Sequence, residues 1–373
     1  MEDRSKRRSI HRRDFVVGSA SAAALVGLGV GCSDDGGDGP NPDGPPAADG
    51  AADSARDLPR EASAACDEKP QPLPAVSGPA RVVEVHDEKS VTQTGYDAAR
   101  VKAMVIAGLQ KLADVADTKQ AWQKLLPDFS ASMRIGIKVN CLNPNLYNAT
   151  EVMTALIESL VSDLGADSGK IWVWDRRTDE LTRSKLTKSA LGVKTAGTVA
   201  STSDASGPGY EAQAECVIDR ETRLSRILTA ETDVTINIAL LKTHNVSGIT
   251  GALKNVYGCV DNPGDFHSGF NTYMPALYRL DAMRKPFRLH ITEGLKAVTK
   301  GDTTDYPDAM PGRLLLSTDP VALDAHALEL VNTIRTQDFK VPALPADKVK
   351  WLDEAVRLNL GTRTTDPQLV TMP

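Results

Sequence analysis

The feature that most constrains the fold is an alternation of short apolar segments with helical patterns between residues 81 and 373. Strands that alternate with helices of this length predict an α/β fold, in which a mainly parallel or mixed sheet carries helices on both faces. Segment 234–241 is the strongest strand, because it is rich in apolar and β-branched residues. We expect residues 81–373 to form a single α/β domain, since one large domain fits this length.

Hydrophobic periodicity gives the expected elements. Strands are expected at residues 82–85, 133–140, 170–175, 234–241, 287–291 and 313–316. Helices are expected at residues 97–114, 150–165, 178–189, 223–232, 250–257, 272–283, 321–334 and 348–358. Thr150 is expected to cap the second of these helices.

Residues 1–31 have the layout of an export signal. Basic residues gather before Phe15, and the stretch from Phe15 to Gly31 carries no charge. A membrane-spanning helix needs about 20 strongly apolar residues, and this stretch is shorter and diluted by Gly, Ser and Ala. The run Arg12-Arg13-Asp14-Phe15-Val16-Val17 resembles the twin-arginine (Tat) motif. That resemblance implies export of the folded protein by the Tat machinery.

Cys32 ends the run Gly29-Val30-Gly31-Cys32, which resembles a bacterial lipobox. Leu28 is one place away from the usual position, so ordinary peptidase cleavage and an unmodified Cys32 stay open as alternatives. We expect Cys32 to be lipidated. The protein would then be periplasmic or in the cell envelope, and would contact the membrane only through this anchor.

Residues 32–80 are predicted to be a flexible, disordered linker. Asp, Gly, Pro and Ala dominate this segment, so it cannot bury enough apolar surface to offset the entropy of ordering. Cys66 lies inside it and is expected to be an unpaired surface thiol, with pairing to another cysteine as the alternative. The chain's 5 cysteines are too few for a disulfide scaffold. Its net charge of −6 gives no support to nucleic-acid binding, which wants a basic surface.

The densest polar cluster follows the strongest strand, at residues 241–259. In open α/β sheets, ligands bind outside the carboxyl ends of the strands. Lys242 and His244 are two residues apart, so an extended backbone points both to one side. Thr250 and Gly251 are expected to open a helix whose backbone N–H groups attract an anion. The alternative is a loop whose polar side chains hydrogen-bond their own backbone.

These patterns assign roles. His244 is predicted to be the general acid/base and Lys242 a second catalytic residue, because an imidazole ordinarily titrates near neutrality. Lys242 and Lys254 would hold a small anionic ligand or cofactor. The predicted ligand-binding residues are Lys138, Asn140, Thr250, Gly251, Lys254, Asn255, Asp319 and Asp324.

Several of these residues have a structural alternative. Lys138 suits a strand-end lysine that reaches solvent. Asp319 precedes Pro320 and suits a helix N-cap, and Asp324 suits the dipole of the same helix. His290 is expected to be a satisfied structural histidine.

A metal site is a further alternative. His244, His267, Cys259 and Asp324 are residue types that suit Zn, Fe or Ni, but their spacing matches no metal signature. The loop that carries His267 is expected to be either a lid over the site or a surface turn.

Three segments, taken in order, resemble the domain of unknown function 362 family over residues 80–335. The first is Ile137-Lys138-Val139-Asn140, and the third is Ser317–Asp324, which follows a Ser-x-Asp-Pro-Val-Ala-x-Asp pattern. The second segment combines Lys-x-His, Thr-Gly-x-x-Lys-Asn and a glycine, at Lys242, His244, Thr250, Gly251, Lys254, Asn255 and Gly258.

The resemblance implies little chemistry, since the family's biochemical role is generally unassigned. Some relatives carry ferredoxin-like modules, which implies redox chemistry, but this chain has no Cys-x-x-Cys for such a cluster. It has Glu293-Gly294 where relatives tend to have Asp-Gly or Asp-Ala. No dinucleotide, P-loop or nucleophile-elbow motif is present either. Two functions remain: an exported enzyme with an anion- or cofactor-binding cleft, and a membrane-tethered binding protein without chemistry.

Overall fold

The computed structural model describes residues 66–67, 69–75 and 77–373. The predicted signal peptide, the lipidation of Cys32 and the linker up to residue 65 lie outside the described residues. The strands are β1 Ala80–His86, β2 Ile135–Lys138, β3 Ile171–Arg177, β4 Lys194–Val199, β5 Glu215–Val217, β6 Arg220–Thr222, β7 Val234–His244, β8 Gly248–Thr250, β9 Phe287–Val298, β10 Arg313–Ser317 and β11 Thr365–Thr371.

The helices are α1 Ala98–Ala113, α2 Thr118–Leu125, α3 Thr150–Ser159, α4 Thr178–Arg183, α5 Lys188–Leu191, α6 Ala252–Asn255, α7 Phe270–Arg279, α8 Asp281–Arg284, α9 Pro320–Thr333 and α10 Trp351–Arg357. Aspartate side chains begin several of them by accepting backbone N–H bonds, as Asp97 does for α1 and Asp117 for α2. None of the described helices is both long and apolar enough to cross a membrane.

The strands form one large sheet in the order β11-β1-β10-β9-β7-β2-β3-β4. Strand β8 also pairs with β7 but lies outside this order. The pairs β9–β7, β7–β2, β2–β3 and β3–β4 are parallel, whereas β10 runs antiparallel to both of its neighbours. The predicted mixed, mainly parallel sheet is therefore confirmed. β7 lies at its centre and is buried along its whole length, as an apolar strand between two helical layers must be.

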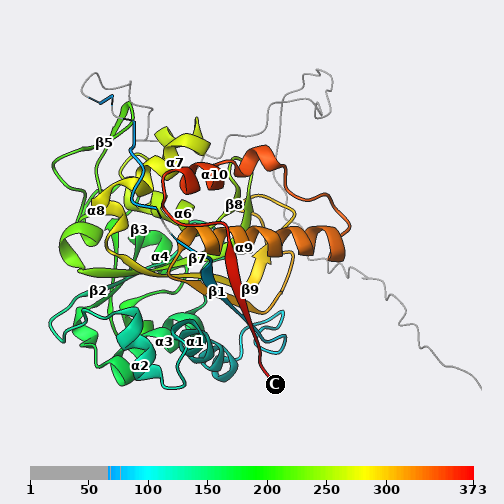
Figure 1. The fold of residues 1–373 in the computed structure, drawn as a ribbon. Coiled ribbons are helices and arrows are strands. Elements are labelled where there is room, and N and C mark those ends of the chain that lie inside the picture. The colour runs from blue at the N-terminus through cyan, green and yellow to red at the C-terminus, as the bar shows by residue number, and fades with distance from the viewer. Residues whose placement is uncertain (1–65, 68, 76) are drawn as a thin grey trace, which may run out of the picture. The chain divides into compact units, whose positions relative to one another are not determined.

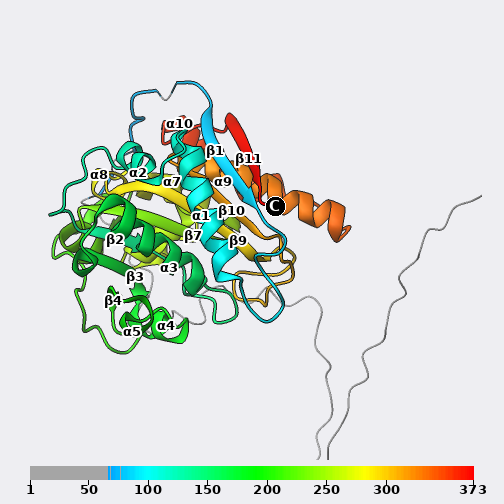
Figure 2. The same ribbon diagram turned by 90° about the horizontal axis from the view of Figure 1, so that it is seen from below.

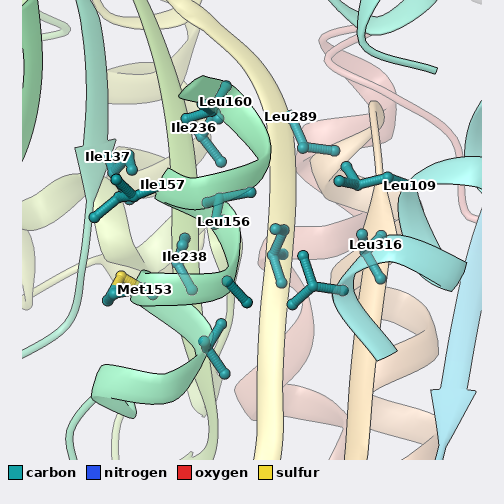
Figure 3. Close-up of a cluster of buried hydrophobic side chains, with 14 of the residues drawn as sticks. Leu109, Ile137, Met153, Leu156, Ile157, Leu160, Ile236, Ile238, Leu289 and Leu316 are labelled. Atoms are coloured by element: carbon teal, nitrogen blue, oxygen red, sulfur yellow. The ribbon is translucent and has the colours of Figure 1, made fainter. Parts of the chain in front are cut away.

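Helices cover both faces of this sheet (Figures 1 and 2). α1, α2 and α3 pack on one face, and Figure 3 shows Met153, Leu156 and Leu160 among side chains of the neighbouring strands, such as Ile236 and Ile238. α6, α7, α9 and α10 pack on the other face around a second apolar cluster. Since successive strand residues face opposite sides, Asn237 points away from the layer that holds Ile236 and Ile238.

Several local predictions differ from the structure. Thr150 is the first residue of α3, and the cap position belongs to Ala149, which has no side-chain cap. The helix expected at residues 223–232 is a short π-helical turn, Ile227–Glu231. The strand expected at 287–291 extends to Val298, and β8 and β11 were not expected, because pairing partners distant in sequence extend or create strands that local pattern does not reveal.

The linker prediction is wrong for residues 66–67, 69–75 and 77–80. Cys66 is buried and forms a disulfide with Cys216 of β5, so the expectation of an unpaired surface thiol is wrong as well. The backbone N–H of Leu73 donates to Leu358 O at 3.0 Å, and Asn359 donates to Leu73 O at 2.7 Å. A covalent bond and contacts with the C-terminal part of the chain, together with the packing of Leu73 on the second apolar cluster, thus order a segment that has few large apolar residues of its own.

Candidate functional site

The chain changes direction within the sheet between β2 and β7. From β2 the chain adds β3 and β4 on one side, and it then returns to place β7 and β9 on the other side. Such a switch point, at the carboxyl ends of parallel strands, is where open α/β sheets bind ligands. Lys242 of β7 and Asn140, just after β2, meet there: Lys242 Nζ donates to Asn140 Oδ1 at 3.0 Å.

The β7–β8 hairpin sets the residues that surround Lys242. Lys242 pairs with Thr250, and His244 pairs with Gly248. Side chains directly opposite each other in an antiparallel pair share one face, so Thr250 lies beside Lys242. The Thr250 hydroxyl is buried and has no hydrogen-bond partner among the described residues. A buried hydroxyl without a hydrogen-bond partner lowers the stability of the fold. This position therefore suits a bound ligand that would supply the missing hydrogen bond.

Lys242 is 1% exposed. Within the part of the chain that the structure describes, Asn140 Oδ1 is its one hydrogen-bond partner, and no carboxylate lies within ion-pair distance. Burial lowers the pKa of Lys242 from 10.5 to about 8, because the charged amine loses its hydration. Lys242 therefore carries a positive charge at neutral pH and releases its proton close to that range.

His244 does not match the predicted near-neutral acid/base. Burial, followed by the nearby Lys254 charge, holds the pKa of His244 well below its ordinary value. Its Nδ1 accepts the backbone N–H groups of Val246 at 3.0 Å and Ser247 at 3.3 Å. The neutral ring thus keeps its proton on Nε2. A group with this titration does not donate and recover protons near pH 7, so the prediction of His244 as the general acid/base is corrected.

Lys254 and His267 complete a lysine–histidine cluster with Lys242 and His244. His267 Nδ1 donates to Pro263 O at 3.1 Å, so its Nε2 accepts from Lys254 Nζ at 3.0 Å. The rings of His244 and His267 stack at 5.9 Å, and burial with Lys254 lowers the pKa of His267 to about 3. The loop that carries His267 is packed into the site, which contradicts the surface-turn alternative.

Lys138 is a buried ion-pair partner, and neither predicted role fits it. Its Nζ donates to Asp175 Oδ1 at 2.6 Å and to Val139 O at 2.8 Å. Asp175 also accepts the backbone N–H groups of Cys141 and Arg176. Burial lowers the pKa of Lys138, but the carboxylate of Asp175 more than offsets this, and the pKa lies above its ordinary value. The charge that was expected to hold a ligand is neutralised inside the protein.

Asp324 occupies the helix start that was predicted to bind an external anion. Its carboxylate accepts the N–H groups of Ala252 at 2.6 Å and Leu253 at 3.0 Å, at the beginning of α6. A Cβ on Gly251 would lie 2.2 Å from Asp324 Oδ1, so only glycine admits this carboxylate. Burial raises the pKa of Asp324 to about 7. Asp324 and Gly251 therefore build the start of α6, and the N–H groups of Ala252 and Leu253 are already bonded to Asp324.

Asp319 is the N-cap of α9, as its structural alternative predicted. It accepts the N–H groups of Val321 at 2.8 Å and Ala322 at 3.0 Å, and also that of Thr362. His290 is a satisfied structural histidine, as expected, because Asn237 and Tyr278 bond its two ring nitrogens. The predicted ligand residues Asn140 and Asn255 bond each other through Asn140 Nδ2 and Asn255 Oδ1 at 3.0 Å.

The metal alternative is not supported. Among the described residues, no three His, Cys, Asp or Glu side chains gather in a way that would hold a metal ion. His244 and His267 do stack. Cys259, however, is buried beside Lys138 and Asp175, and burial raises its pKa to about 12. Asp324 is committed to the start of α6.

Sequence reasoning gave no role to the buried acid Asp175, and it noted the buried acid Glu293 only as a difference from the family. Asp175 neutralises Lys138, and its place at the end of an expected strand was the available signal. Glu293 accepts from Asn148 Nδ2 at 3.0 Å and from the backbone N–H of Ala149 at 3.1 Å, ahead of α3. Burial raises the pKa of Glu293 to about 7. Glu293, which stands where relatives tend to have Asp, therefore has a carboxyl group that anchors the start of α3.

The fold and the site define an α/β protein with a cationic polar cluster at the switch point of a mainly parallel sheet. The chain belongs to the family described as domain of unknown function (DUF362), whose model matches residues 135–329. That range contains the lysine–histidine cluster and Asp324. The resemblance found in the sequence is therefore confirmed.

Other comparisons add little. A crystal structure of a protein from Thermotoga maritima has 10% sequence identity and a TM-score of 0.33, and the match covers 72% of this chain. The match spans 60% of the length of the Thermotoga maritima chain. The curated proteins contain no match to this chain.

Proposed function

We propose that this protein binds a small anion, a carboxylate or a phosphate-like group, at Lys242 and Thr250, and that Lys242 exchanges a proton during its chemistry. The observation that carries the proposal is the unused hydrogen-bonding capacity of these two neighbours. Lys242 has three N–H donors and one described partner, and the Thr250 hydroxyl has none. An anion between them would satisfy both groups and neutralise a buried charge.

Acid/base chemistry follows from the titration of Lys242. A general acid or base works best when its pKa lies near the operating pH, and the pKa of Lys242 is about 8. Lys254 adds a second positive charge close to His244. A non-catalytic binding protein would use the same donors, but its Lys242 would keep its proton throughout.

The protein is also proposed to be exported by the Tat machinery and anchored to the membrane through a lipid on Cys32. The layout of residues 1–31, which predicts an export signal, supports this localisation, and so does the Cys66–Cys216 disulfide, since disulfides persist in oxidising compartments. Mass spectrometry of the membrane fraction should find a diacylglycerol adduct on Cys32. Soluble wild-type protein with an unmodified Cys32 would contradict the anchor.

Isothermal titration calorimetry with inorganic sulfate tests the binding site. Sulfate has no titration near pH 8, so a heat of binding that depends on the buffer reports protons taken up by the protein. We expect sulfate to bind at pH 7, and Lys242→Met to weaken it about 10- to 100-fold. Lys102→Met, on the exposed surface of α1, is the matched control and should bind like the wild type.

The same titrations separate the two functions. Proton uptake on binding at pH 8–9 that disappears in Lys242→Met shows that Lys242 gains its proton together with the anion, as an acid/base role requires. Sulfate binding without proton uptake supports the non-catalytic alternative. Equal sulfate affinity in the wild type and Lys242→Met would contradict the proposed site altogether.

A further inference from the structure

We propose that Asn140 is a positioning residue that holds Lys242 with a neutral amide oxygen, and that a chain of buried neutral side chains fixes which way this amide faces. The chain, here called the amide chain, consists of Asn140, Asn255, Asn237 and His290. The inference deepens the proposed function and rests on it, because Lys242 is the residue proposed to bind the anion.

The first links of the amide chain run away from Lys242 across the switch point. Lys242 Nζ donates to Asn140 Oδ1 at 3.0 Å, and Asn140 Nδ2 donates to Asn255 Oδ1 at 3.0 Å. Asn255 Nδ2 then donates to Asn237 Oδ1 at 2.7 Å. Each amide therefore accepts on the side of Lys242 and donates on the far side.

The last links continue in the same direction. Asn237 Nδ2 donates to His290 Nδ1 at 3.2 Å, so the proton of the neutral ring is on Nε2. His290 Nε2 then lies 3.3 Å from the Tyr278 hydroxyl and donates to its oxygen. Burial lowers the pKa of His290 to about 3, so the ring is neutral at physiological pH. No member of the amide chain carries a charge.

Backbone carbonyls fix the direction of the amide chain. Asn237 Nδ2 also donates to Ala252 O at 2.8 Å, and Asn255 Nδ2 donates to Ile238 O at 3.3 Å. A carbonyl oxygen only accepts, so neither amide can turn over without facing oxygen against oxygen. With Asn255 held in this way, Asn140 must offer its N–H to Asn255 and its oxygen to Lys242.

The positions of these residues make the arrangement rigid. Asn140 follows β2, Asn237 lies within β7, Asn255 ends α6 and His290 lies within β9. All four side chains are buried, so water does not replace a lost partner. The fold therefore presents an amide oxygen to Lys242, whereas an aspartate of the same shape would place its second oxygen against Asn255 Oδ1.

A neutral partner has a functional consequence. A carboxylate at position 140 would pair with Lys242, hold its proton and compete with any external anion, as a nearby opposite charge does. An amide oxygen orients the amine but leaves its charge for the ligand. The amide chain thus explains how a buried lysine keeps a proton that it can release near neutral pH.

The test is a titration of lysine side-chain signals by 13Cε–15Nζ nuclear magnetic resonance in the folded protein. Lys242→Arg identifies the Lys242 signal. In Asn140→Asp, we expect the titration midpoint of Lys242 to rise by about 1–3 pH units, and sulfate affinity at pH 7 to fall at least about tenfold. Asn143→Asp makes the same change at a buried amide that hydrogen-bonds Asp305 O instead, and it should leave the midpoint unchanged.

The outcomes are distinct. An unchanged midpoint in Asn140→Asp would overturn the inference. If Asn140→Asp does not fold, Asn255→Asp decides in the same way, since it sets a carboxylate one link away and should raise the midpoint by a smaller amount. A raised midpoint in a protein that does not bind sulfate supports the role of Asn140 and contradicts the proposed function, so the two can fail separately.

Discussion

Lys138 lies at the end of β2 and Lys242 near the end of the adjacent β7, and each is 1% exposed. They differ in one neighbour: Asp175 pairs with Lys138 at 2.6 Å, whereas Asn140 holds Lys242 with an amide oxygen at 3.0 Å. The pKa of Lys138 lies above its ordinary value, and the pKa of Lys242 falls to about 8. The two lysines are equally buried, so burial alone does not set the pKa of a lysine. The charge of its hydrogen-bond partner sets it as well.

The largest effect is expected at Lys138. Lys138→Met should lower the free energy of unfolding by about 3–5 kcal/mol, because it leaves the buried Asp175 carboxylate without a cation. Chemical denaturation at pH 7 measures this change. The double variant Lys138→Met/Asp175→Asn should recover a large part of the lost free energy of unfolding. A double variant as unstable as Lys138→Met would show that the unpaired Asp175 carboxylate does not cause the loss.

The opposite sign is expected at Lys242. Lys242→Met should raise the free energy of unfolding at pH 7, by an amount that the fall in pKa from 10.5 to about 8 sets at about 3 kcal/mol. Below pH 8 both the folded and the unfolded chain hold the proton, so the gain is fully present. Between pH 8 and 10.5 the unfolded chain holds more protons, wild-type stability rises, and the gain disappears.

Denaturation of both proteins across this pH range checks the prediction. A Lys242→Met variant that is less stable than the wild type at pH 7 would mean that Lys242 has a counter-charge after all. The comparison between the two lysines would then fail.

The sequence placed both lysines at the ends of strands but could not separate their roles. Each lysine lies at the end of a strand and precedes a polar loop, and each was assigned to ligand binding. What distinguishes them is Asp175 in one case and Asn140 in the other, and these contacts depend on the order of strands in the sheet. Strand type and helix caps such as Asp319 are local properties, and periodicity and capping rules recover them.

The roles of His244 and Asp324 were mispredicted for a related reason. The titration of His244 depends on burial and on Lys254, which no local pattern reveals. Asp324 reaches back across the fold to the start of α6, where the sequence shows only a free helix start. Long-range packing sets both roles, so a motif identifies the residues of a site more reliably than their chemistry.

A smaller effect tests why Asp324 is not a partner of Lys242. Gly251→Ala should destabilise the fold by about 1–3 kcal/mol, because its Cβ would overlap the Asp324 carboxylate at 2.2 Å. In an Asp324→Ala background the overlap is gone, so Gly251→Ala should lower the free energy of unfolding by less. A double-mutant cycle measures the difference. Equal costs in the two backgrounds would show that Asp324 does not occupy the start of α6.

The smallest effect is expected at Thr250, the residue opposite Lys242. Thr250→Val removes a buried hydroxyl without a described partner, so it should raise the free energy of unfolding by about 1 kcal/mol. The same change should weaken sulfate binding about 2- to 10-fold. Denaturation and calorimetry on one sample measure both. A variant that loses stability and binds sulfate normally would remove Thr250 from the site.

The most direct test of the account is a pH titration of Lys138 and Lys242 in the wild-type protein, observed by 13Cε–15Nζ nuclear magnetic resonance and assigned with Lys138→Arg and Lys242→Arg. We expect Lys242 to titrate with a midpoint at about 8, while Lys138 stays protonated through that range. Two lysines that titrate together near the ordinary value of about 10.4 would contradict it.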